Sequence, residues 1–273
     1  CASVALVVPE GRMENIGARI GLALGGGFAR GVAHAGVLRV LERHGVPLHC
    51  IAGVSAGCIV ASAFPSVAGA DDIARTGAAM RFSDVARWTV GRMGFAGSDR
   101  MARFLGKLLR QSAFESMRIP LGVVATDLES GEPAHFRERG DVVTAVRASC
   151  SYPGLFQPVR HAGRLLVDGG MSVDVPARLC REMGATHVIA VHLPAPERRS
   201  APANVFEVVN RCFQIVSRRT EDNWRRFSDL ILTPEARDAN WNSFSSAQAL
   251  IEAGERAALD AMPAILKWLR GTR

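Results

Sequence analysis

The chain has 273 residues, of which 48% are hydrophobic and 22% charged, a balance that excludes a disordered or collagen-like protein. No stretch approaches the ~18 uninterrupted apolar residues that a membrane-spanning helix needs. The net charge is +7, and Lys107 and Lys267 are the only lysines, so nearly all cations are arginines. This surplus fits an anionic membrane surface, nucleic acid or a dispersed solvated surface, although no run of five like charges indicates a nucleic-acid tail.

Cysteine usage and the start of the chain bear on the cellular compartment. None of the cysteines forms a C-x-x-C pair, so a zinc knuckle or a redox dithiol is not expected; they are Cys1, Cys50, Cys58, Cys150, Cys180 and Cys212. Several lie in apolar runs, where a reduced cysteine behaves as a small hydrophobic residue, and we expect a cytoplasmic protein, peripheral to a membrane at most. Because the chain begins with Cys1, the alternative is a lipoprotein anchored through that residue, and Met13 is another candidate start.

Short β-rich runs alternate with amphipathic stretches along the chain. The predicted strands are Arg19–Leu24, His49–Gly53, Leu121–Thr126, Arg164–Val167, Val188–His192 and Asp229–Leu232. The predicted helices between them are Val32–His44, Ala56–Phe64, Ala177–Met183 and Val205–Trp224. Apolar strands that alternate with helices predict an α/β fold with a mainly parallel central sheet and helices on both faces.

Two other segments differ in texture from this alternation. From Asp84 to Phe114, apolar residues punctuate a basic, glycine-broken segment, which indicates a helical cap on the core or else a pocket wall or lipid-facing surface. From Ala247 to Leu269, apolar positions recur at helical spacing and predict a core-packing helix with a basic end. No repeat or linker divides the chain. We therefore expect a lead segment over residues 1–18 and a single domain over 19–273, with core motifs in 20–194, a surface loop at 194–202 and a C-terminal completion over 203–270.

A glycine-rich loop, GGGFARG over Gly25–Gly31, follows the first predicted strand and opens a helix. Glycines let backbone N–H groups approach a negative group, and a helix N-terminus favours one. An oxyanion site, a nucleotide site and a structural turn all fit this loop. The dinucleotide fingerprint needs glycine where Arg30 stands, and the Gly-Lys-Ser/Thr of a P-loop is absent.

The second motif is G-x-S-x-G over Gly53–Gly57, again between a strand and a helix. This context is typical of a nucleophile elbow, a sharp turn in which Gly53 and Gly57 leave room for Ser55 to project from the sheet edge. A tight turn with a capping serine is the plainer interpretation.

A nucleophilic serine needs a base, and the sequence offers two. Asp168, followed by Gly169 and Gly170 at a predicted strand end, can approach a serine at a neighbouring strand end, although Asp-Gly is also a common turn pair. His192, in or at the end of a later strand, would complete a Ser-Asp-His set in the chain order of α/β-hydrolases.

In open α/β sheets, motifs at strand ends gather at one edge. Together these three resemble the patatin-like phospholipases, particularly the compact bacterial acylesterase branch, over roughly Ile20 to Pro194. The match lies at G-G-G-x-x-R-G, G-x-S-x-G and D-G-G, with a further similarity over Ala148–Phe156.

The resemblance implies a three-layer patatin-like fold and a serine acyl hydrolase that cleaves carboxylic ester bonds of phospholipids or lysophospholipids. Ser55 would be the nucleophile and Asp168 its proton acceptor, a dyad that forms an acyl-enzyme and requires neither cofactor nor metal. Backbone amides would form the oxyanion hole at Gly25, Gly26, Gly27 and Phe28. The residues that would support the motifs are Arg30, Gly31, Gly53, Gly57, Gly169 and Gly170. We expect Arg30 to order the glycine loop, and Ser149 and Ser151 to be cap or turn hydroxyls.

Other functions remain open at this point. A non-catalytic module would use the Gly25–Gly31 loop for a nucleotide or phosphate, a Ser-Asp-His esterase would use His192, and an acyltransferase would share the acyl-enzyme. The expected partners are a lipid ester substrate and, transiently, an anionic membrane surface; we expect neither nucleic acid nor an obligate protein partner.

Overall fold

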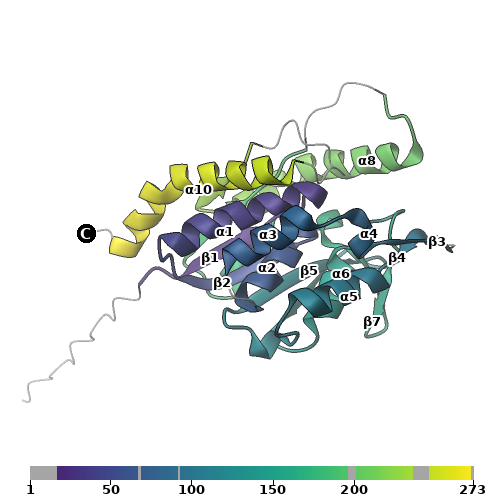
Figure 1. Cartoon of the computed structure of the whole chain (residues 1–273), viewed down its shortest axis with the longest axis horizontal. Coiled ribbons are helices and arrows are strands. Elements are labelled where there is room, and N and C mark those ends of the chain that lie inside the picture. Colours follow the sequence, from purple (N-terminus) through teal and green to yellow (C-terminus); the bar gives the residue numbers. More distant parts are fainter. Residues whose placement is uncertain (1–16, 67–68, 92, 196–200, 236–245, 272–273) are drawn as a thin grey trace, which may run out of the picture.

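The computed structural model describes residues 17–66, 69–91, 93–195, 201–235 and 246–271 (Figure 1). The predicted lead segment, including Cys1 and Met13, therefore lies outside the described residues except for Gly17 and Ala18. A central sheet has the strand order β10-β9-β1-β2-β5-β8-β7, with β6 also paired to β5. The strands are β1 (Ile20–Leu24), β2 (Leu48–Val54), β5 (Leu121–Asp127), β6 (Pro133–Arg137), β7 (Val159–His161), β8 (Arg164–Asp168), β9 (His187–Val191) and β10 (Leu230–Leu232).

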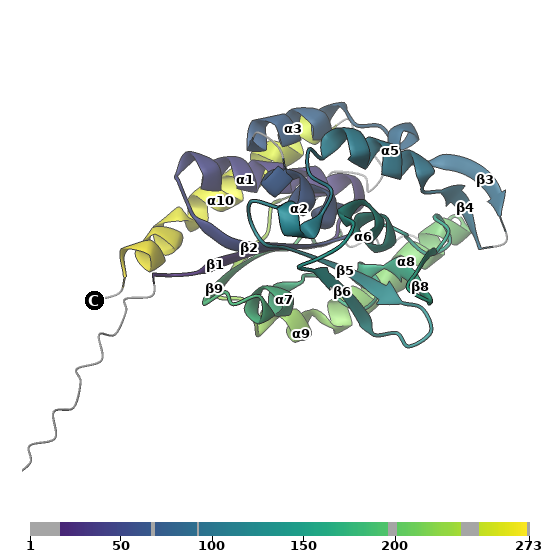
Figure 2. The ribbon, with the colours of Figure 1, turned by 90° about the horizontal axis from the view of Figure 1, so that it is seen from below.

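Helices cover both faces of the sheet, as predicted (Figure 2). On one face lie α1 (Ala33–Arg43), α2 (Ala56–Ser66), α3 (Ala70–Ala79), α5 (Asp99–Leu108), α6 (Val142–Ser149) and α10 (Ala247–Arg270). On the other lie α7 (Ala177–Glu182), α8 (Val205–Arg219) and α9 (Glu221–Arg225). Alternation along β1 explains the two layers, because Leu22 and Leu24 join one buried cluster and Ala23 joins the other.

The sheet is parallel from β10 through β9, β1 and β2 to β5, while β6 and β8 run antiparallel to β5, and β7 antiparallel to β8. The predicted parallel pattern therefore holds for five strands. β6 turns back on β5, and β8 on β7, through short connections, whereas parallel pairing needs a long crossover. Between β7 and β8 stand only Ala162 and Gly163, with φ of 48° and 77°, the positive values that a two-residue hairpin turn requires.

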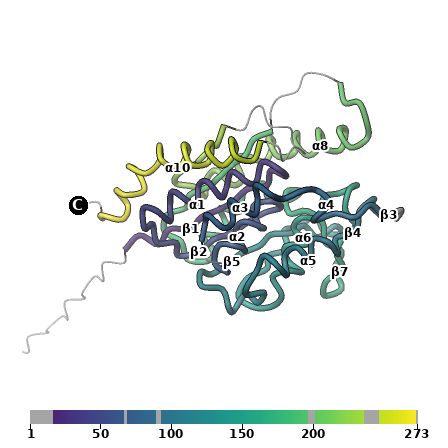
Figure 3. The backbone as a smooth tube through the Cα atoms, in the orientation of Figure 1, coloured from purple at the N-terminus to yellow at the C-terminus, as the bar shows by residue number. Residues whose placement is uncertain are grey.

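The predicted C-terminal helix is confirmed as α10, which runs along α1 (Figure 3). A Cβ at Gly36 of α1 would overlap the carbonyl oxygen of Ile251, and one at Gly254 of α10 would overlap that of Ala33. Two glycines thus let the helices approach closely. The α10 side chains that enter the core at helical spacing are Leu250, Ile251, Ala258, Met262 and Ile265.

The remaining helical predictions hold with changes at the ends. The expected Val32–His44 helix begins as a 3-10 turn, η1 (Phe28–Val32), and continues as α1. The expected Val205–Trp224 helix is divided at Thr220 into α8 and α9. Of the described residues, no helix is long and apolar enough to cross a membrane.

The segment from Asp84 to Phe114 forms in part the expected helical cap on the core. After α4 (Phe82–Val85) it forms a separate two-stranded antiparallel sheet, β3 (Arg87–Gly91) and β4 (Gly94–Gly97), and then α5. Met101 and Leu105 of α5 are buried and cap the core, whereas Trp88 of β3 is exposed. The short turns η2 (Phe114–Ser116) and η3 (Gly169–Met171) complete the elements of the described chain.

Candidate active site

Ser55 occupies a sharp turn between β2 and α2, as the elbow motif predicts. Its φ is 52°, a left-handed conformation that is uncommon for a residue other than glycine. A Cβ at Gly53 would overlap Cys58, and one at Gly57 would overlap the Leu24 carbonyl oxygen. Both flanking glycines are therefore needed for α2 to approach the ends of β1 and β2 this closely.

The elbow is held by Ser149, at the end of α6. The Ser55 N–H donates to Ser149 Oγ over 2.9 Å, and Ser149 Oγ donates to the carbonyl oxygen of Val124 in β5 over 2.6 Å. Ser149 thus joins the nucleophile-elbow backbone to the neighbouring strand and does more than the predicted cap. Ser151 keeps a local role, because its Oγ donates to the Arg147 carbonyl in the preceding helical turn over 2.8 Å.

Asp168 receives a hydrogen bond from Ser55 Oγ, which lies 2.7 Å from its Oδ2. Its Oδ1 accepts the Gly170 N–H over 2.8 Å, and its own N–H donates to the Ser151 carbonyl over 3.0 Å. A Cβ at Gly169 would overlap the Val124 carbonyl oxygen, so Asp-Gly-Gly packs directly on β5. The carboxylate is fixed on both oxygens and points at the serine.

Strand direction shows how this pairing arises. The sequence suggested that Asp168 leaves the sheet at the edge where the parallel strands end. It does not, because β8 runs antiparallel to β5. Instead β8 enters from that edge and ends with Asp168 opposite Ala125, while Val54 pairs with the adjacent Val124. The end of β8 thus meets the end of β2 across β5.

Burial raises the pKa of Asp168 to about 7, the nearby Asp174 acting in the same direction. The hydrogen bonds from Ser55 and Gly170 oppose this increase because they favour the ionised form. Only 2% of Asp168 is exposed. A carboxyl with a pKa near neutrality is a stronger base than an ordinary aspartate, which suits it to accept a proton from a hydroxyl.

The glycine-rich loop lies beside Ser55, since a Cβ at Gly26 would be 3.6 Å from the serine Cβ. Two of the four predicted oxyanion donors hold the loop in place: Gly25 N–H donates to the Val191 carbonyl over 3.0 Å, and Gly26 N–H to the Asp174 carbonyl over 3.2 Å. Gly27 N–H has no hydrogen-bond partner among the residues that the structure describes. The N–H groups of Gly25 and Gly26 are thus engaged in holding the loop, unlike that of Gly27.

Two buried side chains, Arg30 and His34, hold the glycine-rich loop in place. The sequence motif pointed to Arg30 alone. Arg30 donates to the carbonyl oxygen of Pro194, in keeping with its predicted ordering role, and burial lowers its pKa while Asp174 raises it. His34, which spacing did not indicate, is fully buried with Nε2 2.9 Å from the Gly25 carbonyl oxygen. Burial lowers the pKa of His34 to about 4, so the ring is neutral and Nε2–H donates to that carbonyl.

His192, the alternative base, is drawn to other carboxylates. Its Nε2 lies 3.2 Å from Asp174 Oδ2 and its Nδ1 3.8 Å from Glu221 Oε1. The ring also packs on Trp224, with centroids 5.1 Å apart. His192 lines the same cavity as Ser55, but Ser55 donates its hydrogen bond to Asp168.

Two cavities of different character meet at the serine. A cavity of about 390 Å³ extends toward α8 and α9, and apolar side chains such as Leu193 and Phe213 form part of its wall. We call it the polar cavity because it also has charged and amide side chains, among them Arg30, Asp174, Asn210, Gln214, Arg218 and Arg225. An apolar cavity of about 60 Å³ extends toward α4 and α5, lined by Ile59, Met80, Phe82, Val85, Met101 and Phe156 among others. Four residues line both cavities: Phe28, Ser55, Tyr152 and Asp168. Within the described residues, no cluster of three or more histidine, cysteine or acidic side chains is arranged to hold a metal.

An elbow serine, a buried carboxylate and a glycine-rich loop at one sheet edge define the class of α/β proteins with a nucleophile-elbow site. A family model described as patatin-like phospholipase matches residues 22–181, and the chain belongs to that family. An NTE family protein of Mycobacterium tuberculosis is 32% identical over 206 residues, which are 73% of this chain and 57% of the relative. The chain thus spans little more than half of that relative.

Two further comparisons concern a second relative and the fold. Lysophospholipase NTE1 of Debaryomyces hansenii is 28% identical over 217 residues, which are 77% of this chain but 14% of that protein. The crystal structure of VipD from Legionella pneumophila has a TM-score of 0.61 at 14% identity, covering 91% of this chain and 67% of VipD. The fold is therefore the expected patatin-like α/β fold.

Proposed function

We propose that the protein is a serine acyl hydrolase that cleaves carboxylic ester bonds of phospholipids or lysophospholipids through Ser55 and Asp168. The observation that carries the proposal is the 2.7 Å hydrogen bond from Ser55 Oγ to Asp168 Oδ2, at the place where a polar and an apolar cavity meet. Membership of the patatin-like phospholipase family supports it.

The first half of the reaction forms an acyl-enzyme. Ser55 Oγ attacks the ester carbonyl carbon while its proton passes to Asp168 Oδ2. The carbonyl oxygen becomes an oxyanion that faces the N–H groups of Gly27 and Phe28, and removal of one such donor typically lowers kcat by about 10²–10³. The C–O bond to the leaving group then breaks, and the alcohol or lysolipid departs with the proton from Asp168.

The second half releases the acyl group. A water molecule attacks the acyl-enzyme carbonyl, gives a proton to Asp168, and forms a second oxyanion in the same position. Collapse expels Ser55 Oγ, which recovers its proton, and the free fatty acid leaves. Asp168 serves as base and then acid in each half, and its pKa near 7 suits it to both directions of transfer.

The two cavities suggest how a lipid is oriented. An acyl chain has no hydrogen-bonding groups and matches the apolar cavity of Ile59, Met80 and Phe156. A glycerophosphate head group matches the polar cavity, where arginine and amide side chains provide donors for phosphate oxygens. The name of the Debaryomyces relative, a lysophospholipase, agrees with such a substrate.

Turnover of matched substrates tests the proposal. Wild type, Ser55→Ala and Asp168→Asn are assayed with p-nitrophenyl butyrate and with a lysophospholipid, measuring p-nitrophenol and free fatty acid. We expect both substrates to be hydrolysed by wild type and by neither variant above the uncatalysed rate. Retained turnover in Ser55→Ala, or unchanged turnover in Asp168→Asn, would exclude the dyad. Ligand binding without hydrolysis in wild type would instead favour a phosphate-binding module.

A further inference from the structure

Exposed apolar side chains gather at one end of the molecule, on the β3–β4 hairpin and on α8. Of the ten large hydrophobic residues that are exposed in the described chain, seven lie on these two elements. We call the following five the hairpin–α8 patch: Trp88 (63% exposed), Met93 (54%), Phe95 (49%), Val205 (64%) and Val208 (45%). Exposed apolar side chains that gather in one place are typical of an interaction site.

The two halves of the patch are in contact with each other. The ring of Phe95 in β4 lies 5.7 Å from that of Phe206 in α8, edge to face. Both elements lie at the same end of the molecule in two views (Figures 1 and 2), away from the C-terminal end of α10. The patch is thus one surface built from segments more than a hundred residues apart in the sequence.

A series of aromatic rings leads from this surface to the catalytic cavity. Trp88 contacts Phe82 at 5.8 Å between ring centroids, and Phe82 contacts Phe28 and Phe156 at 6.3 Å each. Phe28, Phe82 and Phe156 line the apolar cavity together with Ser55. These ring contacts connect Trp88 on the surface to the wall of the apolar cavity through apolar side chains alone.

The segments that carry the patch are rich in basic residues. Residues 80–110, which carry the hairpin, α4 and α5, contain seven basic residues and two acidic ones, and the chain as a whole has a net charge of +7. The two acids are already engaged, since Asp84 accepts the Arg81 N–H over 2.8 Å and Asp99 pairs with Arg147 at 3.4 Å. Helix α8 adds Arg211, Arg218 and Arg219 against a single acid, Glu207.

We propose that the hairpin–α8 patch is the surface by which this protein docks on an anionic phospholipid membrane, an inference that rests on the proposed lipid hydrolase function. Tryptophan, methionine and phenylalanine side chains enter the interfacial layer, and the surrounding arginines meet anionic head groups. Docking in this orientation brings Trp88, and the aromatic side chains that connect it to the apolar cavity, to the acyl chains. A second copy of the chain fits less well, because two cationic surfaces would face each other.

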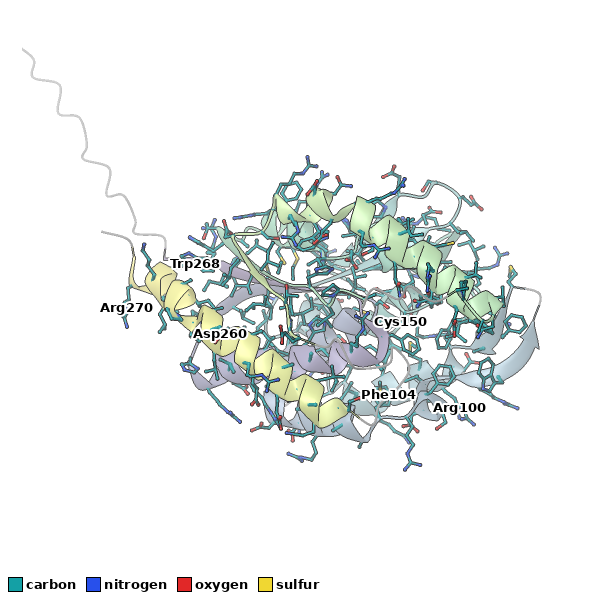
Figure 4. The ribbon with its side chains drawn as sticks, turned by 90° about the horizontal axis from the view of Figure 1, so that it is seen from above. Arg100, Phe104, Cys150, Asp260, Trp268 and Arg270 are labelled. Carbon is teal, nitrogen blue, oxygen red and sulfur yellow. The ribbon has the colours of Figure 1, made fainter. Side chains whose placement is uncertain are left out.

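Vesicle co-sedimentation of the Ser55→Ala protein tests docking without turnover. The vesicles are phosphatidylcholine alone or phosphatidylcholine with phosphatidylglycerol, each at low and high salt. The test variant carries Met93→Ser and Phe95→Ser, and a second carries Trp88→Ala. The control is Leu259→Ser, which removes an apolar side chain of similar exposure (49%) from α10. Leu259 is distant from the patch, because Asp260, the next residue in α10, lies toward the opposite end of the molecule from Arg100 of α5 (Figure 4).

We expect the parent protein to bind anionic vesicles at low salt and to release them as salt rises, because the attraction is screened. The Met93/Phe95 variant and Trp88→Ala should each lose about tenfold or more in partitioning, while Leu259→Ser binds as the parent does. Equal binding of the hairpin variants and the parent would overturn the proposal. So would equal binding to neutral and anionic vesicles, or a hairpin variant that changes only the oligomeric state in light scattering.

The same variants, made with Ser55 intact, separate docking from catalysis. The Met93/Phe95 variant should hydrolyse dissolved p-nitrophenyl butyrate at the wild-type rate, since neither side chain lines a cavity that contains Ser55, and should lose hydrolysis of anionic vesicles. Equal loss on both substrates would overturn the docking role. Failure of the proposed function would appear differently, as wild-type protein that binds vesicles but hydrolyses neither substrate.

Discussion

Ser55 Oγ donates a 2.7 Å hydrogen bond to Asp168 Oδ2, and the two residues come from strands that run in opposite directions on either side of β5. The pairing depends on the register of three paired positions between β5 and β8, which sets the level at which Asp168 stops. Asp168 is also buried, and its raised pKa follows from that position. The pairing of β8 with β5 thus determines both the distance between Ser55 Oγ and Asp168 Oδ2 and the basicity of Asp168.

The pH dependence of turnover should report on this carboxyl. Only ionised Asp168 accepts the Ser55 proton, so kcat/KM should rise about tenfold per pH unit below a midpoint near 7 and level off above it. Steady-state hydrolysis of p-nitrophenyl butyrate between pH 5 and 9 measures the profile. His192→Ala should keep the midpoint and most of the activity. Loss of activity across the whole pH range in His192→Ala would instead identify the histidine as the base.

Asp168 should also lower the stability of the fold at neutral pH. Its pKa in the folded chain, about 7, exceeds the ordinary 3.8, so between these values the folded chain retains a proton that the unfolded chain has released. Stability from this group is therefore lost as pH rises from about 4 to about 7. At pH 8, Asp168→Asn should unfold at a higher urea concentration than wild type, with a free energy of unfolding larger by up to about 4 kcal/mol. At pH 3.5 the two proteins should unfold at a similar urea concentration. A destabilised variant at pH 8 would contradict this.

Ser149 should matter to turnover although it lies outside the dyad. Ser149→Ala leaves the Ser55 N–H without its acceptor and the Val124 carbonyl without its donor, which should reduce stability by about 1–3 kcal/mol and kcat by about tenfold. The matched control is Ser151→Ala, which removes only a bond to the Arg147 carbonyl. Denaturant titration and ester turnover measure both effects. Equal effects of the two substitutions would mean that the elbow does not depend on Ser149.

Met80 should limit the length of acyl chain that the protein accepts. A second apolar cavity of about 50 Å³ lies beyond the one at Ser55, and both are lined by Phe28, Ala29, Ala56, Ile59 and Met80. Met80→Ala should join them and shift preference from p-nitrophenyl butyrate toward the decanoate by about tenfold, roughly the gain from burying two further methylenes. Leu128→Ala, at an exposed site, should leave the ratio unchanged. An unchanged ratio in Met80→Ala would place the acyl chain elsewhere.

The sequence could predict those parts of the site that depend on local backbone geometry. Gly53, Ser55 and Gly57 follow a strand and precede a helix, and the turn they form needs the conformations and close contacts that the motif encodes. Short apolar runs that alternate with amphipathic helical stretches likewise indicated the parallel strands. These features are short-range, so a pattern in the sequence is sufficient.

The parts that escaped prediction depend on contacts between distant segments. The reversal of β8 follows from a two-residue turn at Ala162, and nothing in the apolar pattern of a strand encodes its direction. Ser149 reaches Ser55 across 94 positions. Gly25 and Gly26 were expected to bind an oxyanion, but their N–H groups are taken by Val191 and Asp174, which only the folded chain brings near.

Covalent labelling tests the central assignment most directly. Wild-type protein is treated with a fluorophosphonate, which reacts with an activated serine, and the modified peptide is located by mass spectrometry. We predict one adduct, on Ser55, formed faster as pH rises through 7, absent in Ser55→Ala and strongly slowed in Asp168→Asn. An adduct that persists in Ser55→Ala, or active wild-type protein that is never labelled, would contradict the account.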